Sequence, residues 1–257
     1  MKAIVIGGTG LAGRHIVAAL TAAGHDAGAA SPSRGVDAYT GEGLADALKG
    51  ADIVVDASNS PSQDEAQASE FFRTSTRNLL AAERDAGVRH HVLLSIVGVD
   101  RIPDFGYYNA KVAQEQAVES GYGPGAVAGT PAYSIVRATQ FFEYVTTIMA
   151  WNTDGETVRL SGQRFQPLAL DDLAHALVDV AAGTPTRGIV EIAGPEVLHL
   201  DDAARRILAA HPDGRTVTAD PGTRPLGVDA ESDALTAGAD ARLGATDFAT
   251  WLARGDR

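Results

Sequence analysis

Short runs of β-branched and apolar residues alternate with longer segments of helical periodicity over most of this chain. Such alternation is typical of parallel strands joined by crossover helices. The predicted strands cover residues 2–6, 27–30, 52–57, 91–95, 133–137 and 189–192, and the predicted helices cover residues 11–23, 63–86, 108–120 and 139–151. The pattern therefore predicts an α/β fold built on a Rossmann-type, doubly wound parallel sheet.

The pattern becomes less regular after about residue 151. We expect a strand over residues 157–160, helices over 171–182 and 201–210, and loops over 212–245. Residues 121–131 are rich in glycine and proline, which indicates a surface loop. The predicted organisation is a core over residues 1–151 and a smaller C-terminal portion over 152–257 that caps a substrate cleft. The two are interleaved, because residues 189–192 add a strand to the sheet.

Four glycines lie between the first predicted strand and the helix that follows it. Gly7, Gly10 and Gly13 form the pattern GxxGxxG, and Gly8 adds an overlapping GxGxxG. Early glycines in this context allow a tight turn close to a pyrophosphate, and the last lets the helix pack closely, with its N-terminus facing the anion. The alternative is a tight turn without a ligand. We predict a dinucleotide site whose contacts in this loop are Gly7, Thr9, Gly10, Leu11, Ala12 and Gly13.

The end of the second predicted strand bears on the choice of dinucleotide. NAD sites usually place an Asp or Glu there, to accept hydrogen bonds from the ribose 2′-hydroxyl. Here Asp26 lies at the start of that strand, and its end is followed by Ser31, Ser33 and Arg34. Two hydroxyls and a guanidinium suit a 2′-phosphate, so we predict NADP(H) in preference to NAD(H). Arg34 as a solvated loop residue is the alternative, and Arg14 is a second candidate for the phosphate.

Tyr107 and Lys111 form the pattern YxxxK on a predicted helix, where the i, i+4 spacing places both on one face. A nearby ammonium would lower the pKa of the tyrosine, so that its hydroxyl can transfer a proton near neutral pH. The chain has only three lysines and six tyrosines, which makes chance a poor explanation of the pair. The alternatives are a tyrosine of the core, and Tyr108 as the residue that faces the cleft.

Residues at the carboxyl ends of the predicted strands complete the expected site, because open α/β sheets bind their ligands at that edge. Ser95 ends the fourth strand, and its hydroxyl is suited to orient a substrate carbonyl. The alternative for Ser95 is a hydrogen bond to a backbone group at the strand end. The remaining predicted cofactor contacts are Ala57, Ser58, Ser95, Lys111, Ala138 and Thr139.

Composition limits the possible partners. The net charge of −12 would repel nucleic acid and anionic membranes, and no apolar run approaches the length of about 20 residues that spans a bilayer. The chain has no cysteine, and its seven histidines show no metal-binding spacing, so we expect no metal. The sequence begins with a buried-strand pattern and not with a signal peptide. We therefore expect a cytoplasmic protein that acts on a small molecule.

With these motifs in view, the chain resembles the short-chain dehydrogenase/reductase superfamily, and more narrowly its atypical, NmrA-like branch. The supporting segments are residues 7–14, 95–98, 107–111, 136–142, 170–174 and 193–196, and the likeness covers about residues 1–200 and a final helix over 248–252. The resemblance implies a Rossmann domain with a smaller substrate-binding part, and a monomer or homodimer. Two departures are Ala138, where a proline is common, and Pro32 within the arginine-bearing loop.

Many members of that family are NADPH-dependent reductases of quinones, ketones or related electrophiles. The resemblance implies that Tyr107 donates the proton, Lys111 tunes it and bonds the nicotinamide ribose, and Ser95 orients the substrate oxygen while the nicotinamide delivers hydride. One alternative is a non-catalytic NADP-binding redox sensor that acts on a protein partner. Another is an isomerase, epimerase or dehydratase that retains its nicotinamide cofactor. The sequence leaves the substrate and the oligomeric state open.

Overall fold

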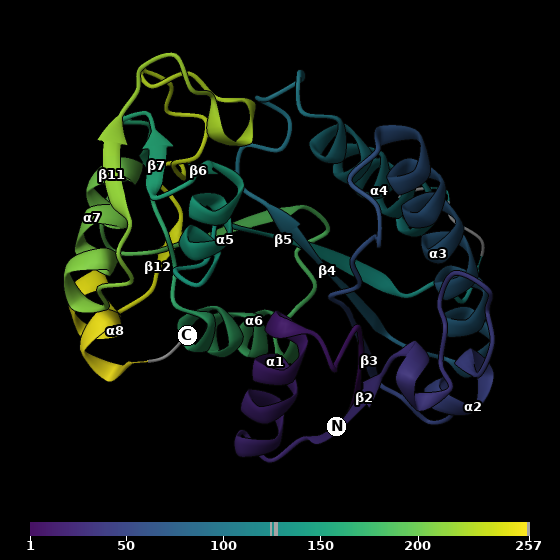
Figure 1. The fold of residues 1–257 in the computed structure, drawn as a ribbon. Helices are drawn as coiled ribbons and strands as arrows, with labels where there is room; N and C mark the ends of the chain where they lie inside the picture. Colours follow the sequence, from purple (N-terminus) through teal and green to yellow (C-terminus); the bar gives the residue numbers. More distant parts are fainter. Residues whose placement is uncertain (124, 126–127, 256–257) are drawn as a thin grey trace.

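A seven-stranded parallel sheet forms the centre of the molecule, in the strand order β12-β9-β5-β4-β3-β1-β2 (Figure 1). The structure is a computed structural model and describes residues 1–123, 125 and 128–255. The strands are β1 (Lys2–Ile6), β2 (Asp26–Ala30), β3 (Ile53–Asp56), β4 (His90–Ile96), β5 (Ala132–Ala138), β9 (Ile189–Ala193) and β12 (Arg242–Leu243). The predicted Rossmann-type fold class is confirmed.

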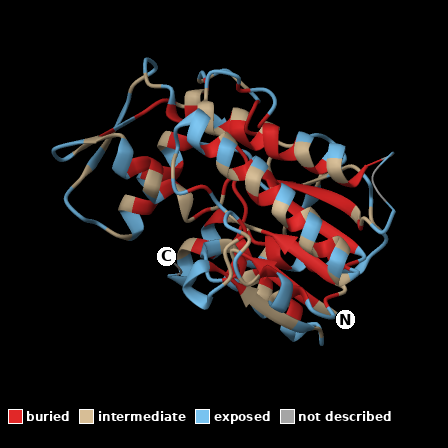
Figure 2. Cartoon of the chain, turned by 90° about the vertical axis from the view of Figure 1, so that its right-hand side faces the viewer, coloured by how far each residue is buried: buried red, intermediate tan, exposed pale blue. Residues whose placement is uncertain are grey.

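Helices cover both faces of this sheet, so that its inner strands β1, β3, β4 and β5 are mostly buried (Figure 2). On one face α1 (Leu11–Ala22) packs against α6 (Leu170–Ala182), and on the other α3 (Glu65–Ala86) packs against α4 (Gly106–Tyr122). Alternation along β1 explains the two layers. Ala3 and Val5 join the apolar cluster of α1 and α6, whereas Ile4 and Ile6 join the cluster below α3. A short helix, α2 (Leu44–Leu48), contacts α3.

The C-terminal residues build a second, smaller layer beside the carboxyl edge of the sheet (Figure 1). It contains the three-stranded sheet β11-β7-β6 and the pair β10-β8. The strands are β6 (Thr153–Asp154), β7 (Thr157–Leu160), β8 (Arg164–Phe165), β10 (Leu198–His199) and β11 (Thr216–Ala219), and the helices are α5 (Tyr144–Trp151), α7 (Leu200–Ala210) and α8 (Phe248–Arg254). Phe142, Phe248 and Trp251 meet in its core. No helix of the described residues is long and apolar enough to cross a membrane.

Three expectations about local structure were wrong. The helix predicted over 139–151 begins only at Tyr144, because Phe141 pairs with Leu168 and holds the preceding residues extended. The segment 212–245, predicted as loops, contributes β11 and β12, two short strands that form against β7 and β9. The loop predicted over 121–131 begins after Tyr122, where α4 ends, and residues 124 and 126–127 lie outside the described part of the chain.

A buried ion pair ties α3 to β4. The Glu83 carboxylate lies 2.8 Å from Nδ1 of His91, and both side chains are fully buried. Tyr122 of α4 stacks on the His91 ring with centroids 4.4 Å apart. Burial acts to lower the pKa of His91, but the adjacent Glu83 carboxylate outweighs it, so the pKa is raised above 6.5. The ion pair and the stacked ring thus hold α3, β4 and α4 together.

We predict that Glu83→Gln lowers the free energy of unfolding in urea by about 3 kcal/mol, because it leaves His91 without its charged partner. The exposed Asp85→Asn on the same helix is the control and should change it by less than about 0.5 kcal/mol. Because the pKa of His91 is raised in the folded protein, the difference should be full below pH 6.5 and shrink as the pH rises through the folded-state value. Equal stability of both variants at pH 6 would contradict the assignment.

Candidate active site

The glycine loop between β1 and α1 packs so closely that side chains are excluded at three positions. A Cβ on Gly13 would lie 2.2 Å from the carbonyl oxygen of Gly7, and one on Gly8 would lie 2.7 Å from Cα of Ala29. Gly7 has a φ of +74°, and a Cβ there would lie 2.5 Å from the carbonyl oxygen of Ala57. The loop, the start of α1 and the end of β3 therefore form one tight backbone cradle.

The N-terminus of α1 opens into this cradle. Gly10 is its N-cap residue and supplies no side-chain hydrogen bond to the first turn. Thr9, Gly10 and Leu11 are exposed, whereas Gly13 is buried against the loop. Backbone N–H groups and a helix dipole at an uncovered helix start suit a pyrophosphate. The residues present therefore fit the phosphates of a dinucleotide.

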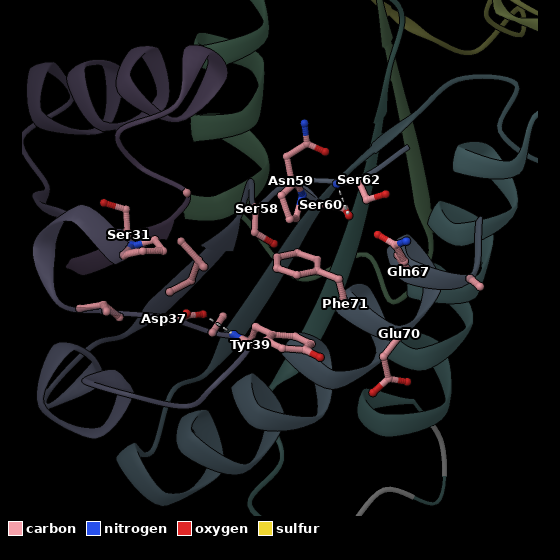
Figure 3. A pocket seen from close by; sticks show the side chains of 17 residues that line it. Ser31, Asp37, Tyr39, Ser58, Asn59, Ser60, Ser62, Gln67, Glu70 and Phe71 are labelled. Atoms are coloured by element: carbon pink, nitrogen blue, oxygen red, sulfur yellow. Dashed lines mark hydrogen bonds between the residues drawn. The ribbon is translucent and has the colours of Figure 1, made fainter. Parts of the chain in front are cut away.

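A cavity of about 820 Å³ extends from Gly7 along the end of β2 (Figure 3). Its lining includes Ser31, Pro32 and Ser58, together with Asp37, Tyr39 and Phe71 and the residues from Asn59 to Ser62. The rings of Tyr39 and Phe71 stack at 5.6 Å and form one wall. The structure thus brings Ser31 and Ser58 together beside the glycine loop.

Ser33 and Arg34 lie next to this cavity but outside its lining, on the single-turn helix η1 (Pro32–Arg34). The hydroxyl of Ser33 lies 3.0 Å from that of Ser31, and the Arg34 side chain is exposed. Arg14, the second candidate for the phosphate, lines a separate cavity of about 210 Å³ with Glu143 and Trp251.

A second cavity, of about 230 Å³, lies at the carboxyl ends of β4 and β5 and is called the aromatic cavity below. It contains Ser95 and Tyr107, as expected, and also Ala138 and Thr139. The remaining lining residues are Asn59, Gln63, Ile96, Phe105, Tyr108, Gln140, Phe141, Tyr144 and Trp151. Both adjacent tyrosines therefore reach it, but Tyr108 is only 3% exposed and packs on Phe105, whereas Tyr107 is partly exposed.

The environment of Tyr107 differs from the expected one. Its hydroxyl donates a hydrogen bond to Oδ1 of Asn59, in the loop after β3. Burial, with a smaller contribution from Tyr144, raises the pKa of Tyr107. The expectation that Lys111 lowers this pKa is therefore wrong for this structure. The Tyr107 hydroxyl is therefore protonated at neutral pH, as an ordinary tyrosine is, and the raised pKa makes it a weaker acid.

Lys111 lies beneath the site and outside the lining of the aromatic cavity. Its Nζ donates to the carbonyl of Leu94 at 2.9 Å and to Oε1 of Gln114, and lies 4.8 Å from the centroid of the Phe72 ring. Gln114 in turn donates to Asp56 at 3.0 Å. Burial lowers the pKa of Lys111 to about 8, opposed by Asp56 and Glu115. The ammonium is thus held in place by neutral acceptors.

Ser95 is part of a buried charged network that the sequence analysis did not include. Its hydroxyl donates to Oε1 of Glu115, and Arg137 binds both oxygens of that carboxylate, at 3.0 and 2.7 Å. Arg137 also pairs with Asp100 at 2.8 Å. Because the Ser95 proton is directed at Glu115, the oxygen presents lone pairs to the aromatic cavity. Two features of the sequence could have indicated this network: Glu115 follows Lys111 by four residues, and Arg137 interrupts an apolar strand.

The family comparison agrees with this geometry. A family model described as NAD(P)H-binding matches residues 7–183, which is more than half of the chain. The protein therefore belongs to the NAD(P)H-binding family. No curated relative matches the sequence.

Solved structures match over nearly the whole chain at low identity. The structure titled MoeE5 in complex with UDP-glucuronic acid and NAD is 18% identical, with 98% of this chain and 97% of that chain covered and a TM-score of 0.75. A UDP-N-acetylglucosamine 4-epimerase from Bacillus cereus is 19% identical, with 92% and 93% covered and a TM-score of 0.68. A dTDP-4-dehydrorhamnose reductase from Bacillus anthracis str. Ames in complex with NADP is 17% identical, with 96% and 90% covered and a TM-score of 0.65. These likenesses show the fold, and a shared fold leaves the type of reaction open.

Proposed function

We propose that this protein is an NADPH-dependent oxidoreductase that reduces a carbonyl, quinone or related electrophile. The observation that carries the proposal is the aromatic cavity, where Tyr107 and Ser95 meet at the carboxyl edge of a sheet whose glycine loop fits a pyrophosphate. The glycine loop would hold the pyrophosphate, and Ala57, Ser58, Ala138 and Thr139 would line the path toward the cavity. When bound, NADPH supplies the hydride.

The preference for NADP rests on the residues that follow β2. Ser31, Ser33 and Arg34 offer two hydroxyls and an exposed guanidinium beside the 820 Å³ cavity. Asp37, an acid in the lining of this cavity, accepts hydrogen bonds from the backbone N–H groups of Tyr39 and Thr40 through one oxygen. Because Asp37 is already hydrogen-bonded and no acid stands at the end of β2, these residues favour a ribose 2′-phosphate over a free 2′-hydroxyl.

The proposed chemistry assigns one task to each side chain. Tyr107, whose hydroxyl is protonated at neutral pH, donates its proton to the substrate oxygen after exchanging its bond to Asn59. The ammonium of Lys111 has three N–H donors. Two of them are bonded to Leu94 and Gln114, so the third is left for a ribose hydroxyl. Ser95, oriented by Glu115, accepts a hydrogen bond from the hydroxyl that reduction creates, a different role from orienting the carbonyl by donation.

Two alternatives remain, each with an observation that favours it. Tyr107, Ser95 and Lys111 each bond to a protein partner in this structure, an arrangement compatible with a redox sensor that binds NADP without turnover. The solved structures of similar fold include an epimerase and a dehydratase, which supports a reaction that regenerates its nicotinamide. Net oxidation of NADPH separates the reductase from both.

Arg34→Ala should weaken NADPH binding about 10-fold or more and leave NADH binding unchanged, because only NADPH carries the 2′-phosphate that the guanidinium would bind. Fluorescence titration of both dinucleotides measures the two dissociation constants. The control is Arg242→Ala, which removes the same charge from β12, at the opposite edge of the sheet. If both variants weakened NADPH binding equally, the effect would come from net charge, and the assignment of Arg34 to the 2′-phosphate would be contradicted.

Tyr107→Phe should lower the rate of NADPH oxidation at least 100-fold with an aromatic aldehyde or a quinone as acceptor, because the proton donor is lost. NADPH affinity should change less than about 2-fold. Tyr122→Phe removes a tyrosine hydroxyl outside both cavities and should retain turnover. A Tyr107→Phe enzyme with an unchanged rate would remove this residue from the mechanism.

A further inference from the structure

The lining of the aromatic cavity contains no charged side chain among the described residues that form it. The two cations beside the lining already have partners: Arg137 binds Glu115 and Asp100, and Lys111 bonds to Leu94 and Gln114. An anionic substrate would therefore lose its hydration without gaining a counter-charge. Burial of an unpaired charge costs several kcal/mol, so the cavity disfavours carboxylates and phosphates.

Six of the thirteen lining residues carry aromatic rings. Phe105, Tyr107, Tyr108, Phe141, Tyr144 and Trp151 all line the cavity. The Tyr144 and Trp151 rings meet edge to face, with centroids 5.6 Å apart and planes at 88°. Trp151 is 54% exposed, an unusual position for an indole, and it stands at the end of α5. Such walls suit the faces and edges of a flat ring.

Two buried polar groups in the same lining have no protein partner. The Thr139 hydroxyl and Oε1 of Gln140 are without hydrogen bonds, in side chains that are 1% and 7% exposed. Buried polar groups are normally paired, so these two indicate an uncharged ligand: the Thr139 hydroxyl can donate to a carbonyl oxygen, and Oε1 of Gln140 can accept from the hydroxyl that reduction creates. The volume of about 230 Å³ is below the usual 300–1,000 Å³ of ligand pockets, which limits that ligand to one or two rings.

From this we infer that the substrate is a small, flat, uncharged aromatic carbonyl compound, and that Trp151 and the uncharged lining exclude nucleotide-linked sugars. The inference rests on the proposed reductase function. In the reaction, hydride from NADPH adds to the carbonyl carbon, the C=O π electrons move to oxygen, and oxygen takes the Tyr107 proton. The products are an alcohol and NADP⁺, and solvent returns the proton to Tyr107. The substrate class differs from the UDP-sugars named for MoeE5.

The test compares three compounds by calorimetric titration into the protein with and without NADP⁺: 2-naphthaldehyde, its 6-carboxylate analogue, and UDP-glucose. We expect 2-naphthaldehyde to bind at least 10-fold more tightly than the carboxylate, and UDP-glucose not to bind up to 1 mM. Comparable affinity for the carboxylate, binding of UDP-glucose, or no binding of 2-naphthaldehyde at 1 mM would overturn the inference.

Two variants of the lining and one control variant locate the effect. Trp151→Ala should weaken 2-naphthaldehyde binding about 5-fold or more, and Leu243→Ala, which truncates an apolar side chain that is 60% exposed on β12, should not. Gln63→Lys adds a cation to an exposed lining residue and should strengthen binding of the carboxylate several-fold. Unchanged binding in both lining variants would place the ligand elsewhere.

NADPH oxidation is followed separately with 2-naphthaldehyde and its carboxylate analogue, so that the two proposals can fail independently. Selective binding of 2-naphthaldehyde without turnover would contradict the reductase and leave the ligand class standing. Turnover of the carboxylate at the rate of 2-naphthaldehyde would contradict the ligand class and leave the reductase standing.

Discussion

The close contact between the glycine loop and α1 is the constraint on which the site depends. With no Cβ on Gly13, the helix approaches the Gly7 carbonyl more closely than any other residue would allow. The same loop touches Ala57 at the end of β3, which sets the position of Asn59 and hence the partner of the Tyr107 hydroxyl. The close packing at Gly7 and Gly13 thus links the position of the phosphate cradle to the position of the Tyr107 hydroxyl.

Buried polar networks fix the reacting side chains on this frame. Glu115 and Arg137 join α4 to β5 and direct the Ser95 proton away from the cavity. Gln114 links Lys111 to Asp56 at the end of β3. Networks of this kind are stable only when their members are paired, so they impose one arrangement on the helix and the strands. The aromatic cavity, in contrast, has uncharged walls and two unpaired polar groups.

Local patterns in the sequence predicted most of the sheet and the glycine cradle, because both depend on residues close together in the chain. The strands β1, β3, β4 and β5 each contain a short apolar run, and Gly7 to Gly13 form one contiguous motif. Tyr107 and Ser95 were expected in one site, and the structure places both in the aromatic cavity.

Features that depend on distant pairs were not predictable in this way. The hydrogen bonds of Tyr107 to Asn59 and of Ser95 to Glu115 join residues 48 and 20 positions apart. The short strands β11 and β12 form only because β7 and β9 offer free edges, and their own residues carry little periodicity. The pKa of Tyr107 depends on the burial of its side chain, and burial cannot be inferred from the i, i+4 spacing to Lys111.

A crystal structure of the protein with NADPH would test the central claim most directly. The account predicts the pyrophosphate on the backbone N–H groups at the start of α1, the 2′-phosphate beside Ser31 and Arg34, and the nicotinamide facing Ser95 and Tyr107. A dinucleotide whose pyrophosphate lies away from the glycine loop, or whose nicotinamide points away from the aromatic cavity, would contradict it.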